Sequence, residues 1–136
     1  DRGVEVTLTT TEDSPDWRNV VQVRGTMADG SVVSVSGTLT GPKHIERIVE
    51  INGYDMELVP TEHMAFFSYE DRPGIVGVVG RLLGDAGVNI AGMQVGRDVK
   101  GGKALIALTV DSAIPPALLD VITTEIGAES GRRVEL

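Results

Sequence analysis

The sequence predicts an α+β protein in two parts, a mostly antiparallel β sheet followed by a β-α-β-β-α-β unit. Period-two alternation with many Val and Thr residues marks the first part, and two stretches with helical spacing between strand-like runs mark the second. The 136 residues suit one ordinary domain or two small ones. We therefore divide the chain into residues 1–61 and 62–136.

The first part has the pattern of strands joined by tight turns. Strands are predicted at 4–9, 19–26, 31–38, 47–51 and 54–59. Asp29-Gly30 and Asn52-Gly53 separate consecutive strands, and both dipeptides favour hairpins. Because little in this part could cover both faces of the sheet, we expect an incomplete domain or a sheet that packs against another chain.

A predicted turn at 41–47 brings Lys43, His44 and Arg47 together. Lysine supplies a point charge and arginine a planar fork, and both suit a phosphate or a carboxylate. A solvated connection between strands is the alternative interpretation. The spacing alone does not decide between the two.

The second part alternates strands with helices. Strands are predicted at 64–69, 88–95, 104–110 and 132–136, with a turn at 100–102 between the second and the third. Apolar residues on one helical face predict helices that open at Pro73-Gly74 and at Pro115-Pro116. This order is the ferredoxin-like arrangement, in which both helices cover one face of a four-stranded antiparallel sheet.

The first predicted helix contains three glycines and ends before Gly87. Gly77, Gly80 and Gly84 each weaken a helix relative to alanine. We attribute them to a close approach between the helix and the sheet. Their spacing differs from the dinucleotide-binding G-x-G-x-x-G motif.

Composition excludes several classes of function. A net charge of −8 argues against nucleic acid or an anionic membrane as a partner, and the absence of Cys removes disulfides and thiolate metal sites. The two His residues lack the spacing of a metal site, and residues 101–103 lack the Ser or Thr that completes a phosphate loop. We expect no catalytic residues, no metal and no cofactor in this chain. No apolar run is long enough to span a membrane, and the start at Asp1 suggests a soluble piece of a longer protein.

Three motifs of the second part carry a resemblance to a known family. YEDRPGIV at 69–76, GVNIAGMQVGR at 87–97 and GGKAL at 101–105 resemble the ACT domain that ends bacterial D-3-phosphoglycerate dehydrogenases. Residues 1–61, with RIVEINGY at 47–54, resemble the latter part of the intervening domain in the long, mycobacterial-type form. The same pair of domains occurs in a bacterial L-serine dehydratase, which is the alternative.

The resemblance implies a regulatory module that binds L-serine, the end product of the pathway, and mediates feedback inhibition. In the family, the site lies between two ACT domains of a cytoplasmic homo-oligomer, a tetramer in the parent enzyme, and NAD is bound by a separate domain. Carried onto this sequence, the serine-binding residues are Tyr69, Asp71, Arg72, Pro73, Gly74, Asn89 and Ile90. A purely structural oligomerisation module is a third interpretation.

The chemistry of these residues agrees with that implication. A helix that begins at Pro73-Gly74 offers unpaired N–H groups to a carboxylate or a polar oxygen. Asp71 suits an ammonium group, and Asn89 offers both a donor and an acceptor. Taken without the resemblance, Asp71 is also a capping or turn residue and Asn89 also a turn residue.

Overall fold

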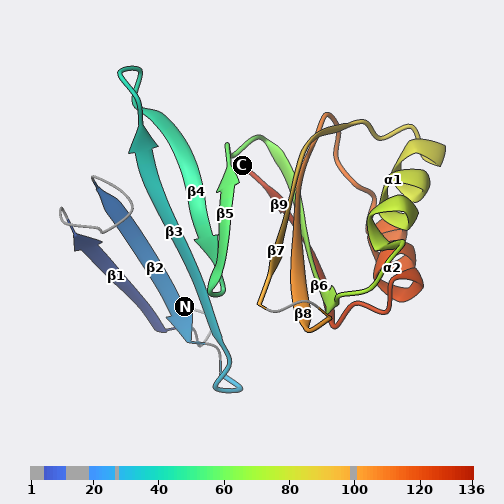
Figure 1. Cartoon of the computed structure of the whole chain (residues 1–136), viewed down its shortest axis with the longest axis horizontal. Coiled ribbons are helices and arrows are strands. Elements are labelled where there is room, and N and C mark those ends of the chain that lie inside the picture. The colour runs from blue at the N-terminus through green and yellow to red at the C-terminus, as the bar shows by residue number, and fades with distance from the viewer. Residues whose placement is uncertain (1–4, 12–18, 27, 99–100) are drawn as a thin grey trace. The chain divides into compact units, whose positions relative to one another are not determined.

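The structure is a computed structural model that describes residues 5–11, 19–26, 28–98 and 101–136 (Figure 1). The chain forms two compact units, Asp1–Val59 and Pro60–Leu136. Val4 of the first predicted strand and Lys100 of the predicted turn lie outside the described residues.

The first unit is a five-stranded antiparallel sheet whose strands follow one another in chain order. The strands are β1 (Glu5–Thr11), β2 (Val20–Thr26), β3 (Val32–Thr40), β4 (Ile45–Ile51) and β5 (Tyr54–Leu58). Val- and Thr-rich alternation suits such a sheet because branched side chains pack well on a pleated surface. The predicted antiparallel arrangement is confirmed.

Two hairpin turns form where the sequence predicts them. Between β4 and β5, Asn52 and Gly53 have φ angles of 51° and 85°, the left-handed pair that a tight two-residue turn requires. Between β2 and β3, Asp29 Oδ1 accepts hydrogen bonds from the Ser31 amide at 2.8 Å and the Ser31 hydroxyl at 2.6 Å. Asparagine, aspartate and glycine thus act here through local backbone geometry.

The predicted turn at 41–47 is too long. The turn covers residues 41–44, and β4 begins at Ile45, which pairs with Thr40 of β3. Gly41 and His44 adopt φ angles of 69° and 50°, so four residues suffice to reverse the chain. Residues 45–47 therefore belong to strand β4 and not to the turn.

Over β1, β2 and β3, one face of this sheet is apolar and exposed within the described residues. Cross-strand register places Val6, Leu8, Val23 and Val33 on the same face, and Val6 and Leu8 are 61% and 64% exposed. The expectation that this part does not cover its own sheet agrees with that exposure. The opposite face carries the polar side chains described below.

The second unit has the predicted order of elements. These are β6 (His63–Glu70), α1 (Ile75–Asp85), β7 (Ile90–Arg97), β8 (Lys103–Val110), α2 (Pro116–Glu125) and β9 (Ser130–Glu135). The strands form one antiparallel sheet in the order β7-β8-β6-β9, and both helices lie on one face of it (Figure 1). The predicted four-stranded sheet is confirmed, although its last strand begins two residues earlier, at Ser130.

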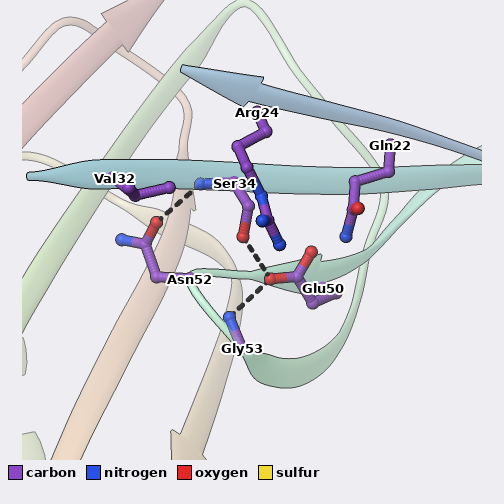
Figure 2. A pocket seen from close by; sticks show the side chains of 7 residues that line it. All are labelled: Gln22, Arg24, Val32, Ser34, Glu50, Asn52 and Gly53. Atoms are coloured by element: carbon purple, nitrogen blue, oxygen red, sulfur yellow. Dashed lines mark hydrogen bonds between the residues drawn. The ribbon is translucent and has the colours of Figure 1, made fainter. Parts of the chain in front are cut away.

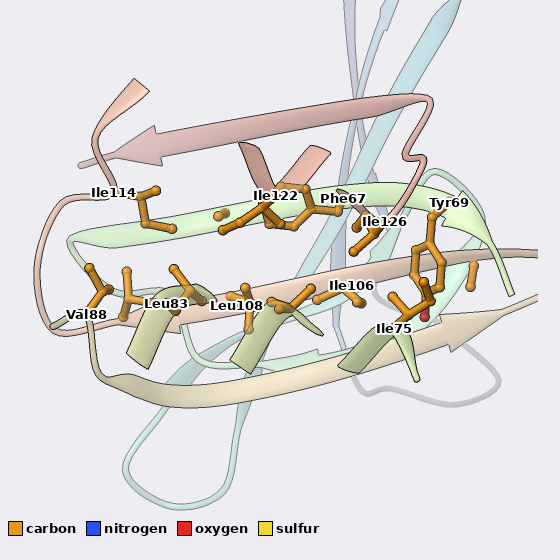
Figure 3. Packing of buried hydrophobic residues seen from close by; sticks show 14 residues of the cluster. Phe67, Tyr69, Ile75, Leu83, Val88, Ile106, Leu108, Ile114, Ile122 and Ile126 are labelled. Carbon is orange, nitrogen blue, oxygen red and sulfur yellow. The ribbon is translucent and has the colours of Figure 1, made fainter. Parts of the chain in front are cut away.

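The core of this unit fills the space between the helices and the sheet (Figure 3). Phe67 of β6, Leu83 of α1 and Ile122 of α2 are fully buried. Strand β8 is buried almost throughout, from Ala104 to Val110, as its apolar run predicts for a central strand. Burial of each large side chain contributes roughly 1.5–3 kcal/mol, so this core holds the helices on the sheet.

Both helices end in the same way. Gly87 and Gly127 have φ angles of 74° and 60°, and each follows the last helical turn. The Val88 amide donates to the Leu83 carbonyl at 2.9 Å, and the Ala128 amide donates to the Thr123 carbonyl at 2.9 Å. These are Schellman caps, which explain why glycine stands at both ends.

The prediction that the glycines of α1 mark a close approach between the helix and the sheet is wrong within this chain. A Cβ built on Gly77, Gly80 or Gly84 meets no described atom within 4 Å outside the local backbone. The tightest glycine among the described residues is Gly131 of β9, whose Cβ would overlap Thr123 Oγ1 and lie 3.0 Å from Phe67 Cε1. Helix α2 thus approaches the sheet closely at β9.

We predict opposite effects for two Gly→Ala substitutions in this unit. Gly131→Ala should lower the free energy of unfolding by about 1–3 kcal/mol, because Phe67 and Thr123 cannot both move away. Gly80→Ala should raise it by about 0.5–1 kcal/mol, because alanine favours a helix and finds open space. Urea denaturation of both variants measures these changes. Equal effects at the two positions would contradict the packing described here.

Candidate functional site

The turn that joins β6 to α1 contains four of the seven predicted serine-binding residues. We call residues 71–74 the DRPG turn. The Asp71 amide donates to the Gly102 carbonyl at 2.7 Å, which ties the turn to the β7–β8 hairpin. Gly74 caps α1 with a φ of 91°, and among the described residues no side chain caps this helix and no acidic residue stands in its first turn. Its first N–H groups therefore remain available, as the sequence predicts.

Asp71 is held by the β7–β8 hairpin. Its Oδ2 atom lies 3.3 Å from Arg97 Nη1 and accepts a 3.4 Å hydrogen bond from the Gly101 amide. The Asp71 side chain is only 17% exposed, whereas that of Arg97 is 53% exposed. The carboxylate is therefore fixed, and its partner reaches it from a largely solvated position.

Tyr69 precedes the turn, and its ring is part of the core. The residue is 2% exposed and lies near Ile75 at the start of α1 (Figure 3). Burial, together with the negative charge of Asp71, raises the pKa of the phenol, and the positive charge of Arg97 partly offsets this. The ring packs in the core, and the charges of both Asp71 and Arg97 act on the phenol.

The side chain of Arg72 forms a hydrogen bond at the end of α2. Its Nη2 donates to the Ile126 carbonyl at 2.7 Å, at the C-terminal end of the helix. A guanidinium there satisfies a terminal carbonyl and complements the helix dipole. Arg72 therefore anchors the DRPG turn to the second helix.

Asn89 and Ile90 lie at the other end of the same sheet. Asn89 Nδ2 donates to Asp111 Oδ2 at 2.7 Å, and the Asp111 amide donates to the Asn89 carbonyl at 3.0 Å. Ile90 pairs with Val110 at one end of β8, whereas Arg97 pairs with Ala104 at the other. At a rise of about 3.3 Å per residue, the two ends are about 20 Å apart. One chain therefore does not bring Asp71 and Asn89 into a single site.

The predicted basic cluster lies on the turn between β3 and β4. Lys43 and His44 are exposed, and Arg47 Nε donates to Thr40 Oγ1 at 2.9 Å. The three residues share one turn and the strand that follows it. An anion site there stays a prediction.

A pocket of about 450 Å³ lies on the polar face of the first sheet (Figure 2). Register brings Gln22, Ser36 and Glu50 side by side across three strands, with Arg24 beside Ser34 in the next row. The sequence analysis did not identify this pocket. The only signal in the sequence was the alternation of polar residues in β2 and β3. This alternation does not indicate a pocket until the strand register shows which residues lie side by side.

Glu50 organises the polar residues of this pocket. Its carboxylate accepts hydrogen bonds from the Gly53 amide and, at 2.7 Å, from the Ser34 hydroxyl (Figure 2). The Ser36 hydroxyl also donates to it, at 2.7 Å. Burial by itself raises the pKa of the carboxyl group, but these hydrogen bonds outweigh it and leave the pKa below its ordinary value. Glu50 thus joins β3, β4 and the following turn through one charged group.

Comparison with known proteins identifies the class of the second unit. Residues 63–127 match the sequence model of the ACT domain. That segment has the described β-α-β-β-α order on an antiparallel sheet, and β9 follows it. The second unit belongs to the ACT domain family.

The whole chain is similar to the C-terminal region of D-3-phosphoglycerate dehydrogenases. It is 40% identical over 136 residues to the enzyme of Mycobacterium leprae (strain TN) and 41% identical to that of Mycobacterium tuberculosis (strain ATCC 25618 / H37Rv). The enzyme of Bacillus subtilis (strain 168) is 35% identical. All of this chain is aligned in each case, and it spans 25–26% of the relative.

The described part of the chain lacks two kinds of feature. Neither of its helices has the length and the apolar run needed to cross a bilayer. The described residues also contain no group of three or more His, Asp or Glu side chains placed to hold a metal ion.

We predict that Glu50→Gln destabilises the first unit in a pH-dependent way. The folded-state pKa is lowered, so the carboxylate stabilises the fold above the unfolded-state pKa and loses this effect as the pH falls through the folded-state value. At neutral pH the variant should lose about 1–2 kcal/mol. In strong acid the difference should vanish. Urea denaturation across the acidic range measures it, with the exposed Glu57→Gln as the control.

The basic turn yields a separate prediction. If Lys43, His44 and Arg47 bind one anion, inorganic phosphate should shift their NMR signals in a saturable manner. Arg81, on the exposed face of α1, serves as the control. Equal, non-saturating shifts at Arg81 and at the turn would mean screening by salt and no site.

Proposed function

We propose that this chain is a regulatory, L-serine-binding module of a D-3-phosphoglycerate dehydrogenase. The ACT domain and the similarity of the whole chain to these dehydrogenases support it. The observation that carries the proposal is the pairing of an uncapped helix N-terminus with the fixed carboxylate of Asp71. These groups are complementary to the carboxylate and the ammonium of an amino acid.

We further propose that two chains complete each binding site. Asp71 and Asn89 lie at opposite ends of one sheet, so a ligand that contacts both must lie between two ACT domains. In such a pair the DRPG turn of one chain faces Asn89 of the other, and the arrangement repeats by two-fold symmetry. Tyr69, Arg72, Pro73, Gly74 and Ile90 then shape the site around the two polar contacts.

This arrangement supports feedback inhibition by L-serine. A ligand that contacts two chains favours the relative position of the chains in which both contacts form. Seven non-hydrogen atoms limit the binding free energy of serine to about −10 kcal/mol, so each charged contact matters. We propose that the shift in subunit arrangement slows an NAD-dependent active site elsewhere in a cytoplasmic, tetrameric parent enzyme, which catalyses the first step of L-serine biosynthesis.

The relatives favour this proposal over the serine dehydratase interpretation. Each of the three relatives described above is named D-3-phosphoglycerate dehydrogenase. A purely structural module would leave the helix N-terminus and Asp71 without a ligand. A rise in thermal stability with millimolar L-serine would distinguish the serine-binding module from a purely structural one, because a ligand of the native state stabilises it by mass action.

We predict that Asp71→Asn and Asn89→Ala each weaken L-serine binding by about tenfold or more. Each substitution removes a hydrogen bond to a charged group, which contributes about 1.5–3 kcal/mol. Isothermal titration calorimetry measures the affinities, and circular dichroism checks the fold. Asp85→Asn, which alters an exposed acid at the far end of α1, is the matched control. Unchanged affinity in both variants would exclude the two residues from the site.

We also predict that mixing the two binding-deficient variants restores part of the binding. In a mixed dimer of Asp71→Asn and Asn89→Ala chains, one site combines both substitutions and the other site has neither. Random exchange of subunits should therefore restore about a quarter of the wild-type sites. Calorimetry of the mixture gives the number of sites. No recovery after verified subunit exchange would contradict a site shared between chains.

A further inference from the structure

The ion pair between Asp71 and Arg97 occupies the group that the proposed site offers to an ammonium. The two side chains are 3.3 Å apart, and the guanidinium comes from the last residue of β7. Oδ2 of Asp71 already accepts hydrogen bonds from Arg97 and from the Gly101 amide, so a ligand ammonium that binds Oδ2 competes with the guanidinium. Arg97 was not among the residues predicted from the sequence.

The two partners differ in their freedom to move. Asp71 is 17% exposed, its backbone amide is bonded to the Gly102 carbonyl, and its carboxylate also accepts the Gly101 amide. Arg97 is 53% exposed and extends on a long, flexible stem at the edge of the sheet. Partly exposed ion pairs contribute little to stability, so the guanidinium can swing away at low cost while the carboxylate stays in place.

We propose that Arg97 binds the carboxylate of the amino-acid ligand after the ligand's ammonium has displaced it from Asp71. This inference rests on the amino-acid site proposed above. In the exchange, one ion pair opens and two form: ammonium to Asp71, and carboxylate to the planar fork of Arg97. The net charge of the site is unchanged, and every charged group keeps a partner.

The exchange selects zwitterions by charge. An amine without a carboxylate displaces Arg97 and leaves the guanidinium without a new partner. A carboxylate without an ammonium gains nothing from Asp71, which keeps its own arginine. A free α-amino acid supplies both charges on one carbon, so the closed ion pair discriminates against ligands that carry only one of them.

The test compares two ligands on the wild-type chain and on Arg97→Gln. L-Serine carries both charged groups, and ethanolamine keeps the ammonium and the hydroxyl but lacks the carboxylate. In the variant, L-serine should bind about tenfold more weakly or worse, because the carboxylate has lost its cation. Ethanolamine should bind more tightly, because no guanidinium competes for Asp71. NMR titration measures both affinities, including those in the millimolar range.

Two controls accompany the comparison. Arg81→Gln removes another arginine from an exposed ion pair, Arg81 with Asp85, and should change neither affinity. Arg97→Lys keeps the charge but loses the fork, and should recover part of the L-serine affinity. Urea denaturation verifies that each variant is folded.

Opposite changes for the two ligands support the proposal. Equal weakening of both ligands would overturn it, because Arg97 would then only position Asp71. Unchanged binding of L-serine, or no gain for ethanolamine, would overturn it as well. Failure of the folded wild-type chain to bind L-serine would instead refute the proposed function itself, so the two failures are distinguishable.

Discussion

Antiparallel pairing around β8 is the constraint on which the rest of the second unit depends. Because β6 and β7 both run antiparallel to β8, the chain leaves β6 at one end of the sheet and, after α1, enters β7 at the opposite end. The turn after β6 carries Asp71, and the residue before β7 is Asn89. Their separation follows from chain direction and from the length of β8, and no rearrangement of side chains can remove it. A ligand that needs both residues therefore requires a second chain, which couples binding to assembly.

Both polar side chains of the proposed site, Asp71 and Asn89, already have a partner within the chain. Asp71 pairs with Arg97 at one end of the sheet, and Asn89 bonds to Asp111 at the other. A free carboxylate on a half-buried turn would attract any cation, whereas a closed pair responds only to a ligand that compensates both charges. Pairing of this kind costs little affinity for the matching ligand and lowers the affinity for others.

In the first unit, one partly buried charge, that of Glu50, connects neighbouring strands. The apolar face of this five-stranded sheet is exposed over β1–β3, and polar contacts add to the connections between its strands. Glu50 supplies three of them and connects residues that are up to 16 positions apart in the chain. The pKa of its carboxyl group lies below the ordinary value because the hydrogen bonds to the charged form outweigh the effect of burial. Glu50, Ser34 and Gly53 also line the pocket on the polar face.

The sequence by itself determined the local elements, because periodicity, helix ends and hairpin dipeptides act over a few residues. Both helices, the Asn52-Gly53 turn and the available N-terminus of α1 follow from such signals, and the family motifs pointed to Asp71 and Asn89. Only the tertiary structure decided what depends on register and on approach between elements. It paired Arg97 with Asp71 across 26 positions, turned Arg72 toward α2, and placed Glu50 beside Ser34. It also showed that close packing occurs at Gly131 and not at the glycines of α1. Such contacts join residues that are distant in the chain, and no local pattern records which of them meet.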